Sequence, residues 1–365
     1  MTGDYDFVLL DAEIRSLRKF LLDGGTIIFN AARGLDEFSA AVVREMRRVM
    51  PHKTFMKLPP DHPVFNGRYR IGEVTMMVNG VQFSQAPDLY SIDIGTRAAA
   101  ILVPGGMGAA WSGEEYHPAG KHLLGESAVR LGVNLVAYVL GSTEYGRFLA
   151  QQFPIYDGAT RGGDVLRFAA VRYSGSWDVN PALQNRLMQA LRDNTTIDVD
   201  FRPHTVELTD PQLGRYPLLF MTGHYDFALS KAEAENLRVY LTRGGTLVAS
   251  AAAGFRPFDI ALRRELKRAV PSADLVKLPP SHPLFMSSWN PIRTVEYTPA
   301  LKRENPTLED PEFYALFIED RLAVLYTPYD FAGALNREAN PYSKGLTPDD
   351  ATKIAINIVA YVMGQ

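Results

Sequence analysis

The sequence contains no cysteine in its 365 residues, which excludes disulfides, thiolate metal sites and cysteine nucleophiles. Long apolar runs are also missing: no stretch of about 18 apolar residues occurs, so we expect no membrane-spanning segment in this chain. The amino-terminal MTGDYDF lacks the basic and apolar regions of a signal peptide. Because a chain without cysteine suits the cytoplasm as well as the periplasm or cell envelope, the compartment stays open.

An excess of positive charge is absent as well. Lysine and arginine together number 38 and the acidic residues 41, which gives a formal net charge of -3. Since phosphate binding needs a basic face, we do not expect nucleic acid as an obligate partner. Apolar residues make up 46% of the chain and charged residues 22%, which is typical of a folded globular protein with room for two domains.

What the chain does contain is an internal duplication. Residues 221–285 match residues 1–65 at 31 of 65 positions, without a gap and at a constant offset of 220. Both copies share Thr-Gly-x-Tyr-Asp-Phe, Gly-Gly-Thr and Lys-Leu-Pro-Pro-x-His-Pro-x-Phe. A period of 220 residues is too long for a solenoid repeat, so each copy predicts a domain. We predict a first repeat at 1–142, a linker at 143–164 and a second repeat at 165–365.

The second copy begins with a segment that the first copy lacks. Apolar patterns predict a strand at 165–173, a helix that begins at Pro181 with Asn180 as its N-cap, and a strand near 205–208. The first copy starts just before the shared Thr-Gly, so it is predicted to lack this strand-helix-strand portion. Two explanations stay open: a chain that begins too late, or a natural half-domain that borrows a sheet edge from its neighbour.

Strand and helix patterns then alternate in both copies. Ser230 and Glu233 form a predicted capping box, and Gly244 suits the left-handed residue that ends a helix. Helices, buried strands and a hairpin follow in the same order in each copy, which predicts an α/β fold with a mostly parallel sheet and right-handed crossovers. The strands predicted in both copies are 26–30, 90–94 and 98–103, and 246–250, 314–318 and 322–327.

Several of these motifs, taken in order, resemble an uncharacterised bacterial family known as domain of unknown function 4159. The motifs are Tyr-Pro-Leu-Leu-Phe-Met-Thr-Gly, Leu-x-x-Gly-Gly-Thr, Arg-Glu-Leu-Lys-Arg, Leu-Pro-Pro-x-His-Pro-Leu-Phe and the closing Asn-Ile-Val-Ala-Tyr-Val. The resemblance covers nearly all of 165–365 and, without its front, 2–141. It implies two tandem flavodoxin-like domains related to class I glutamine amidotransferases, in proteins often tied to the bacterial cell envelope. It implies no reaction, because the family has none assigned.

The amidotransferases that the resemblance points to carry a cysteine on the turn after a central strand. Here that turn carries Asn30 and Ser250 in the two copies, and the chain holds no cysteine, so a thiol-dependent amidotransferase is excluded. Many members of the resembling family carry acidic residues just after this strand, and their absence here weakens a metal or general-base site. Ser250 as a nucleophile would also lack the flanking Gly-x-Ser-x-Gly pattern. We therefore assign no catalytic residue, no metal site and no cofactor.

Ten residues remain as candidates for ligand binding, at the predicted carboxyl edge of the sheets or in the motifs beside it. Asp6 and Asp226 follow a strand, where a carboxylate can bind a ligand or satisfy backbone N–H groups at a helix start. His62 and His282 are repeated between the copies; they either bind a ligand or cap a backbone carbonyl within a proline-fixed connection. The candidates are Asp6, Asn30, Arg33, Gly34 and His62 in the first copy, and His224, Asp226, Ser250, Gly254 and His282 in the second.

The turn before the second helix of each copy suggests an anion site. Gly34, beside Arg33, and Gly254 could form a helix start whose backbone N–H groups bind an anion. Each copy has a single glycine there, so a phosphate loop is not predicted. His224 is a candidate of the second copy alone, because the first copy has Asp4 at that position.

These features favour a non-catalytic binding or scaffolding module that holds a protein or small-molecule partner at the carboxyl edge of its sheets. Duplication suits such a module because two linked sites raise avidity, and the two repeats could also pack on each other in place of a dimer. The alternative is a hydrolase or transferase with an unrecognised site around Asp226, Ser250 and His282. A third possibility is that the second copy keeps an activity while the first serves as its packing partner.

Overall fold

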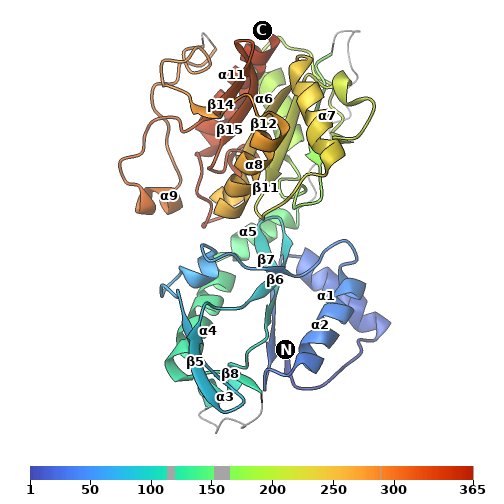
Figure 1. Ribbon diagram of the computed structural model, residues 1–365, viewed down its shortest axis with the longest axis vertical. Coiled ribbons are helices and arrows are strands. Elements are labelled where there is room, and N and C mark those ends of the chain that lie inside the picture. The colour runs from blue at the N-terminus through green and yellow to red at the C-terminus, as the bar shows by residue number, and fades with distance from the viewer. Residues whose placement is uncertain (113–119, 152–164, 288, 365) are drawn as a thin grey trace. The chain divides into compact units, whose positions relative to one another are not determined.

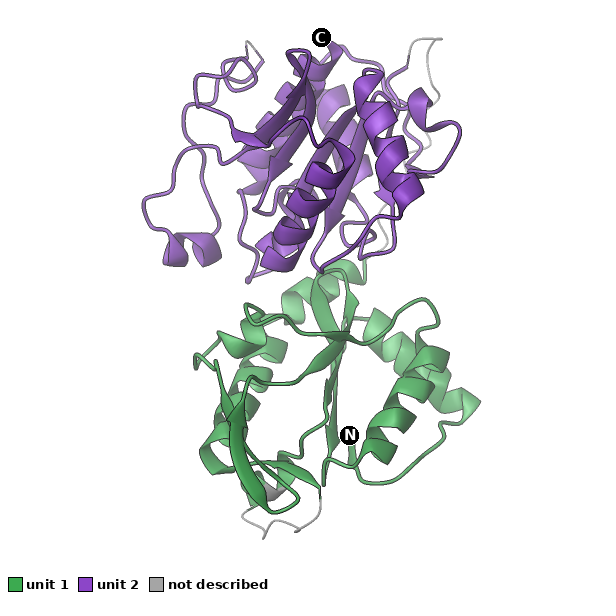
Figure 2. Cartoon of the chain, viewed as in Figure 1, with its two compact units in different colours: residues 1–151 green, residues 152–365 purple. Residues whose placement is uncertain are grey.

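Two α/β units, residues 1–151 and 152–365, make up the chain (Figure 2). The structure is a computed structural model that describes residues 1–112, 120–151, 165–287 and 289–364. Helices cover a central sheet in each unit (Figure 1). No helix in the described part of the chain is long and apolar enough to cross a membrane.

A helix occupies the first part of the predicted linker. This helix, α5 (Thr143–Leu149), belongs to unit 1, because Tyr145 is buried and its hydroxyl accepts a hydrogen bond from the Thr96 N–H at 3.1 Å. The structure therefore differs from the linker predicted over 143–164, since a contact with a distant turn has no local sequence signal. Residues 152–164 lie outside the described residues.

A seven-stranded sheet runs through unit 2 (Figure 1). Along the chain its strands are β9 (Phe168–Arg172), β10 (His204–Glu207), β11 (Leu218–Gly223), β12 (Thr246–Ala251), β13 (Val276–Lys277), β14 (Tyr314–Ile318) and β15 (Arg321–Thr327). Their order across the sheet is β10-β9-β11-β12-β15-β14-β13. The four pairs from β10 to β15 are parallel, and the pairs β15–β14 and β14–β13 at one edge are antiparallel. This sheet is therefore mostly parallel, as the sequence predicts.

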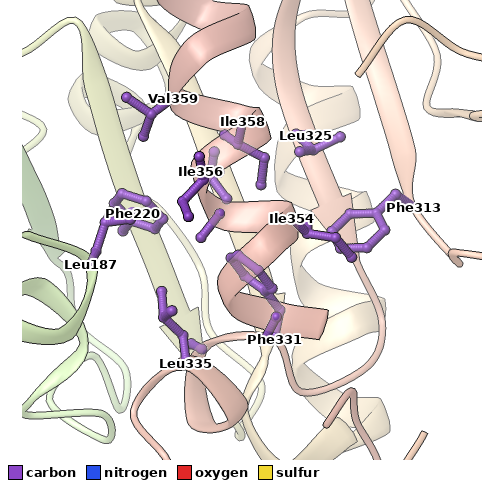
Figure 3. Close-up of a cluster of buried hydrophobic side chains, with 14 of the residues drawn as sticks. Leu187, Phe220, Phe313, Leu325, Phe331, Leu335, Ile354, Ile356, Ile358 and Val359 are labelled. Atoms are coloured by element: carbon purple, nitrogen blue, oxygen red, sulfur yellow. The ribbon is translucent and has the colours of Figure 1, made fainter. Parts of the chain in front are cut away.

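Two hydrophobic cores lie on opposite faces of this sheet. The helices of unit 2 are α6 (Leu183–Asn194), α7 (Lys231–Thr242), α8 (Arg256–Ala269), α9 (Pro299–Glu304), α10 (Ala332–Leu335) and α11 (Pro348–Met363), with 3-10 turns η2 (Leu213–Arg215) and η3 (Ala252–Gly254). Since side chains alternate along a strand, Phe220 joins the core under α6 and α11, whereas Leu219 and Met221 join the core under α7 and α8. Figure 3 shows the first of these cores around α11.

Unit 1 is built on a five-stranded sheet of order β1-β2-β7-β6-β3, with strands β1 (Thr2–Gly3), β2 (Ile27–Ala31), β3 (Met56–Lys57), β6 (Tyr90–Ile94) and β7 (Arg97–Val103). The pairs among β1, β2 and β7 are parallel and the other two antiparallel. A smaller antiparallel sheet contains β4 (Val74–Val78), β5 (Val81–Gln85) and β8 (Lys121–Leu123). The helices are α1 (Asp11–Leu22), α2 (Asp36–Val49), α3 (Gly108–Ser112) and α4 (Gly125–Gly141), with the 3-10 turn η1 (Pro63–Phe65).

Local sequence signals explain several element boundaries. The Ser230 hydroxyl accepts the Glu233 N–H at 3.2 Å, and the Glu233 carboxylate accepts the Ser230 N–H at 2.7 Å, so the predicted capping box of α7 is confirmed. Gly244 takes a φ of +103° just after the same helix, as a left-handed helix end requires. The predicted hairpins also form, between β6 and β7 and between β14 and β15.

The sheet of unit 1 ends at β1, with no further strand beside it among the described residues. The equivalent strand of unit 2, β11, is flanked by β9, and α6 packs against α11 on that side. Val133 and Val136 of α4 are exposed to 40% and 53%, whereas their counterparts Ile356 and Val359 of α11 are buried. Two apolar side chains of α4 are thus exposed at positions whose counterparts in α11 are buried, on the helix that α6 contacts.

Candidate functional site

The carboxyl edge of a parallel sheet is the usual place for a ligand, at the point where the chain order reverses. In unit 2 the chain passes from β9 outward to β10 and then returns to β11 on the other side of β9. The reversal therefore lies between β9 and β11. Because no strand lies beyond β1 among the described residues of unit 1, this crevice is described in unit 2 alone.

A group of linked polar side chains lies at the reversal. Thr222 Oγ1, at the end of β11, donates to Asn180 Oδ1 at 2.7 Å. The amide nitrogens of Asn180 and Asn336 both donate to Glu338 Oε1, each at 2.7 Å. We call these four residues the asparagine–glutamate cluster. Thr222, Asn180 and Asn336 are all buried, so the cluster lies inside the edge of the sheet and not on an open surface.

One acceptor of this cluster is left over. Asn336 Oδ1 is buried and has no hydrogen-bond partner among the described residues, although the amide nitrogen of the same side chain is paired. Buried polar atoms in folded proteins are nearly always hydrogen-bonded, so an exception asks for an explanation. A hydrogen-bond donor on a bound ligand would be such an explanation, because an amide oxygen accepts two hydrogen bonds.

Backbone conformation brings the cluster together from distant segments. Asn180 lies in the turn before α6, which begins at Leu183, so the prediction that Asn180 caps a helix beginning at Pro181 is wrong. On the other side Arg337 takes a φ of +59° after α10, and this left-handed residue turns the chain back so that the Glu338 N–H reaches the Gly333 carbonyl at 3.0 Å. Asn336 is held between that turn and the helix.

Tyr173 is a further buried side chain at the end of β11. Its hydroxyl donates to the Thr222 carbonyl at 3.0 Å. Burial raises the pKa of Tyr173, so the phenol stays protonated and keeps its hydrogen bond. Gly223 is required beside it, since a Cβ at that position would overlap the tyrosine hydroxyl. Tyr173 therefore packs against the end of β11 beside Thr222 of the asparagine–glutamate cluster.

His224 and Arg33, two of the predicted candidates, take part in contacts within their own units. The His224 ring lies 4.3 Å from the Tyr225 ring and 5.8 Å from that of Phe255, measured between ring centroids. In unit 1 the counterpart of this histidine, Asp4, accepts the Arg33 backbone N–H at 2.9 Å and its Nε at 3.0 Å. Arg33 is thus held by a carboxylate of its own unit.

Asp6 and Asp226 form ion pairs on the outside of the second helix of each unit. Asp226 lies 3.0 Å from Arg264 of α8, and Asp6 lies 2.8 Å from Arg44 of α2. The aspartate side chains are 67% and 62% exposed, so these pairs contribute little to stability. The structure thus shows arginine partners for these carboxylates in place of the helix-capping role, and ligand binding by them stays a prediction.

Ser250 and Asn30 make the same kind of hydrogen bond in the two units. Ser250 Oγ, at the end of β12, accepts the Ala332 N–H at 3.3 Å. Asn30 Oδ1, at the end of β2, accepts the Met107 N–H at 3.0 Å. Each side chain ties a central strand to the loop that follows the next strand. The repeated contact explains why a polar residue occupies this turn in both copies.

Ser250→Ala is expected to lower the free energy of unfolding of unit 2 by about 1 to 2 kcal/mol, because the buried Ala332 N–H loses its acceptor. Chemical denaturation of the full chain measures the loss. Ser281→Ala, at an exposed position, serves as the control and should stay within about 0.5 kcal/mol of the parent. Equal stability of all three proteins would show that the Ser250 hydrogen bond is not required.

Gly34 and Gly254 are needed for backbone packing. They have φ values of +62° and +71°, in the left-handed region that favours glycine. A Cβ on either residue would overlap a carbonyl oxygen, that of Lys121 for Gly34 and that of Lys344 for Gly254. The close approach of two backbone segments therefore accounts for both glycines without an anion.

His62 and His282 each cap a 3-10 turn or tight turn through the ring. His62 Nδ1 accepts the Val64 N–H and His282 Nδ1 accepts the Leu284 N–H, both at 3.2 Å. The rings thus cap a backbone N–H, where a backbone carbonyl was expected. Burial lowers the pKa of His282, which favours the neutral ring that this acceptor role needs.

His282 lies far from Ser250. Its ring packs against Phe317 and against Tyr361 near the end of α11. Phe317 pairs with Leu322 of β15, whereas Ser250 pairs with Thr327, five residues further along the same strand. At about 3.3 Å per residue this is about 16 Å along the sheet. The structure therefore does not gather Asp226, Ser250 and His282 into one site.

The sequence does not predict Asn180, Asn336 or Glu338 as a site residue. Their one sequence signal is the composition of the loop at 336–340, where Asn, Arg, Glu and Asn follow an apolar strand and a small helix. No group of three His, Asp or Glu side chains suited to a metal ion occurs in the part of the chain that the structure describes.

The chain also matches a known family. A family model described as Domain of unknown function (DUF4159) matches residues 1–140 and again residues 167–363. The first match falls in unit 1 and the second in unit 2, consistent with tandem copies of one domain. No curated protein matches the sequence.

Proposed function

We propose that this chain, which belongs to the family of Domain of unknown function DUF4159 over both of its units, has a binding role that neither requires nor uses catalysis. The proposed site is the asparagine–glutamate cluster at the carboxyl edge of the sheet in unit 2. Its ligand is a small molecule, or the tip of a protein partner, that presents an N–H or O–H donor.

We also propose that both units have the flavodoxin-like architecture of the class I glutamine amidotransferases. The order of the parallel strands in unit 2 supports this. Numbered along the chain, β9, β10, β11, β12 and β15 are strands 1 to 5, and they lie in the order 2-1-3-4-5 across the sheet. That order is typical of flavodoxin-like proteins, which bind their ligand beside strand 1 at the carboxyl edge.

The unpaired carbonyl oxygen of Asn336 carries the proposal. It is fully buried, it lies in a cluster that includes the Glu338 carboxylate, and it lacks a donor among the described residues. Two acceptor groups side by side suit an amine, an amide or a hydroxyl group. Desolvation makes such a bond specific, because a ligand without the donor would leave the acceptor unpaired.

The geometry of the candidate nucleophile supports binding over hydrolysis or group transfer. Ser250 Oγ accepts a hydrogen bond from a backbone N–H, and Phe317, against which the His282 ring packs, lies about 16 Å away along the sheet. A serine nucleophile needs a base within hydrogen-bond reach. The enzyme alternative around Asp226, Ser250 and His282 therefore has no geometric support.

A thermal-shift screen of the full chain against nucleotides, sugars, amino acids and divalent ions tests the proposal. A ligand present at about 100 times its dissociation constant adds about 2.7 kcal/mol, a shift of several degrees. Asn336→Leu should abolish the shift for a ligand bound at the cluster. Asn357→Leu, which changes an equally buried asparagine of α11, should lower the melting temperature yet keep the shift.

Retention of the full shift in Asn336→Leu would place the ligand elsewhere and overturn the proposed site. Turnover of any ligand in the screen, lost in Ser250→Ala, would overturn the non-catalytic role and revive the enzyme alternative.

A further inference from the structure

A cavity of about 420 Å³ lies between α2 and the strands β6 and β7 in unit 1. Ser39, Val43 and Arg47 line it from α2, spaced four residues apart on one side of the helix. Tyr90 and Leu102 line it from β6 and β7, where they are direct cross-strand neighbours. A cavity of this size suits a small organic molecule. We call it the α2 cavity.

The corresponding space in unit 2 is filled by side chains. The Arg263 guanidinium lies 4.5 Å from the ring centroid of Tyr314 and 5.4 Å from that of Tyr326. Its Nε is 2.6 Å from Asp259 Oδ1, and the Tyr326 hydroxyl donates to the same oxygen at 2.7 Å. These four residues form a closed stack, which we call the arginine plug.

Unit 1 keeps only one residue of the arginine plug. The constant offset of 220 puts Ser39 and Val43 where unit 2 has the acid and the arginine. Leu102 takes the place of the buried tyrosine, because both occupy the same register beside the neighbouring central strand. Tyr90 remains as the stacking ring. Smaller side chains in place of an aspartate, an arginine and a tyrosine leave the space that forms the cavity.

Removal of the plug also leaves a hydroxyl without a partner. Ser39 Oγ is buried and makes no hydrogen bond among the described residues. It stands where unit 2 has a carboxylate, so the negative charge that holds a guanidinium there is gone. A buried hydroxyl can donate one hydrogen bond and accept two, and a polar atom of a ligand would satisfy it.

Positive charge gathers at one end of the cavity. Arg47 has no acidic partner among the described residues, although its counterpart Lys267 pairs with Asp274 at 2.6 Å. Thr54 replaces that aspartate in unit 1, and Lys53 brings a second cationic side chain to the same lining. Among the other charged lining residues, Asp36 pairs with Lys121, and Asp88 pairs with the nearby Lys57. An anionic group would therefore be bound beside Arg47.

We propose that the α2 cavity binds a small organic anion with a planar apolar body and one carboxylate. The planar body stacks on Tyr90 and covers Leu102, as the guanidinium stacks on the tyrosines of unit 2. The carboxylate pairs with Arg47, and a polar atom of the body reaches Ser39 Oγ. This site lies in unit 1 and is independent of the asparagine–glutamate cluster.

Calorimetric titration of the full chain with 2-naphthoate tests the inference, beside its neutral and cationic analogues 2-naphthamide and 2-naphthylmethylammonium. We expect 2-naphthoate to bind at least about ten-fold more tightly than the amide, and the cation not to bind measurably. Arg47→Gln should remove about ten-fold of the affinity for 2-naphthoate and with it the preference over the amide.

Val43→Arg should abolish binding, because it returns the guanidinium of the plug to the cavity. Val136→Arg places the same side chain on the exposed face of α4 and serves as the matched control. Ser39→Asp combined with Val43→Arg rebuilds the ion pair of the plug and should be both stable and unable to bind, which covers the case that the single change unfolds unit 1.

Absence of 2-naphthoate binding to the parent protein, or unchanged binding in both Val43→Arg variants, would overturn the inference. Asn336→Leu should leave 2-naphthoate binding unchanged, so the failure of one site is visible without the other. Equal affinity for 2-naphthoate and 2-naphthamide would overturn the role of Arg47.

Discussion

Arg97→Ala is expected to lower the free energy of unfolding of unit 1 by about 4 kcal/mol. The Arg97 side chain is 1% exposed. Its guanidinium donates to the Leu21 carbonyl at 3.0 Å, the Gly25 carbonyl at 2.9 Å and Thr26 Oγ1 at 2.8 Å. Truncation leaves these acceptors unpaired at the end of α1 and also creates a cavity. Both effects lower the free energy of unfolding, and their contributions add.

Arg321→Ala is the matched variant of unit 2. Arg321 occupies the same place at the start of β15 and donates to Leu241 at the end of α7, but it is only half-buried. We expect a smaller loss there, about 2 kcal/mol. Arg130→Ala removes an exposed ion pair with Glu126 and should cost less than about 0.5 kcal/mol.

Denaturant titration combined with hydrogen exchange measures these losses, since exchange assigns each loss to one unit. If Arg97→Ala were as stable as Arg130→Ala, the hydrogen bonds of Arg97 would contribute nothing. Loss of protection confined to unit 2 would equally contradict the expectation.

Asp330→Ala is expected to cost unit 2 about 3 kcal/mol or more. The Asp330 side chain is buried, and its carboxylate accepts the Gly333 N–H at 2.7 Å and the Ser343 hydroxyl at 2.6 Å. These bonds join the loop after β15 to the segment that leads into α11. Without the carboxylate both donors stay buried and unpaired, so the loop that carries the asparagine–glutamate cluster loses its support.

The difference in unfolding free energy between Asp330→Asn and the parent protein should depend on pH. Burial raises the pKa of Asp330 above that of an unfolded aspartate, despite hydrogen bonds that lower it. Below the pKa of the unfolded state, Asp330 is protonated in both the folded and the unfolded protein and does not lower the free energy of unfolding. As pH rises from about 4 toward the folded pKa, only the unfolded state ionises, and the parent protein loses up to about 1.4 kcal/mol per pH unit.

The asparagine variant does not titrate, so its stability relative to the parent should improve over that window and then level off. Unfolding free energies of both proteins between pH 4 and pH 8 give the difference directly. Ser281→Ala, which removes no titratable group from an exposed position, is the control and should follow the pH dependence of the parent. A difference that does not change with pH would contradict a raised pKa at Asp330.

Much of the fold follows from signals that lie close together in the sequence. The capping box at Ser230, the left-handed Gly244 and the two hairpins depend on neighbouring residues, and each is present. The duplication extended these signals from one copy to the other. The duplication also places Ser250 and Asn30 at equivalent positions. That both side chains accept a hydrogen bond from a backbone N–H is visible only in the structure.

The burial of side chains against segments distant in the chain could not be predicted from the sequence. Arg97 and Arg321 are repeated between the units, yet nothing near them in the chain indicates that they cap the helices α1 and α7. The histidines of the proline-rich motif were placed near the carboxyl edge, whereas His282 packs at the other end of the sheet. The length and direction of the connections on either side of this motif decide where the histidines lie, and neighbouring residues in the sequence do not indicate them.

Residue patterns in the chain were sufficient for the duplication, the α/β class and most helix and strand boundaries, because hydrophobic period, caps and turns are short-range properties. The two candidate sites arise only in three dimensions. Asn180 and Glu338 are 158 residues apart in the chain and meet because β11 returns beside β9. The α2 cavity exists because two separate elements, α2 and β7, carry smaller side chains than their counterparts in unit 2, and only the packing shows that these positions face one space.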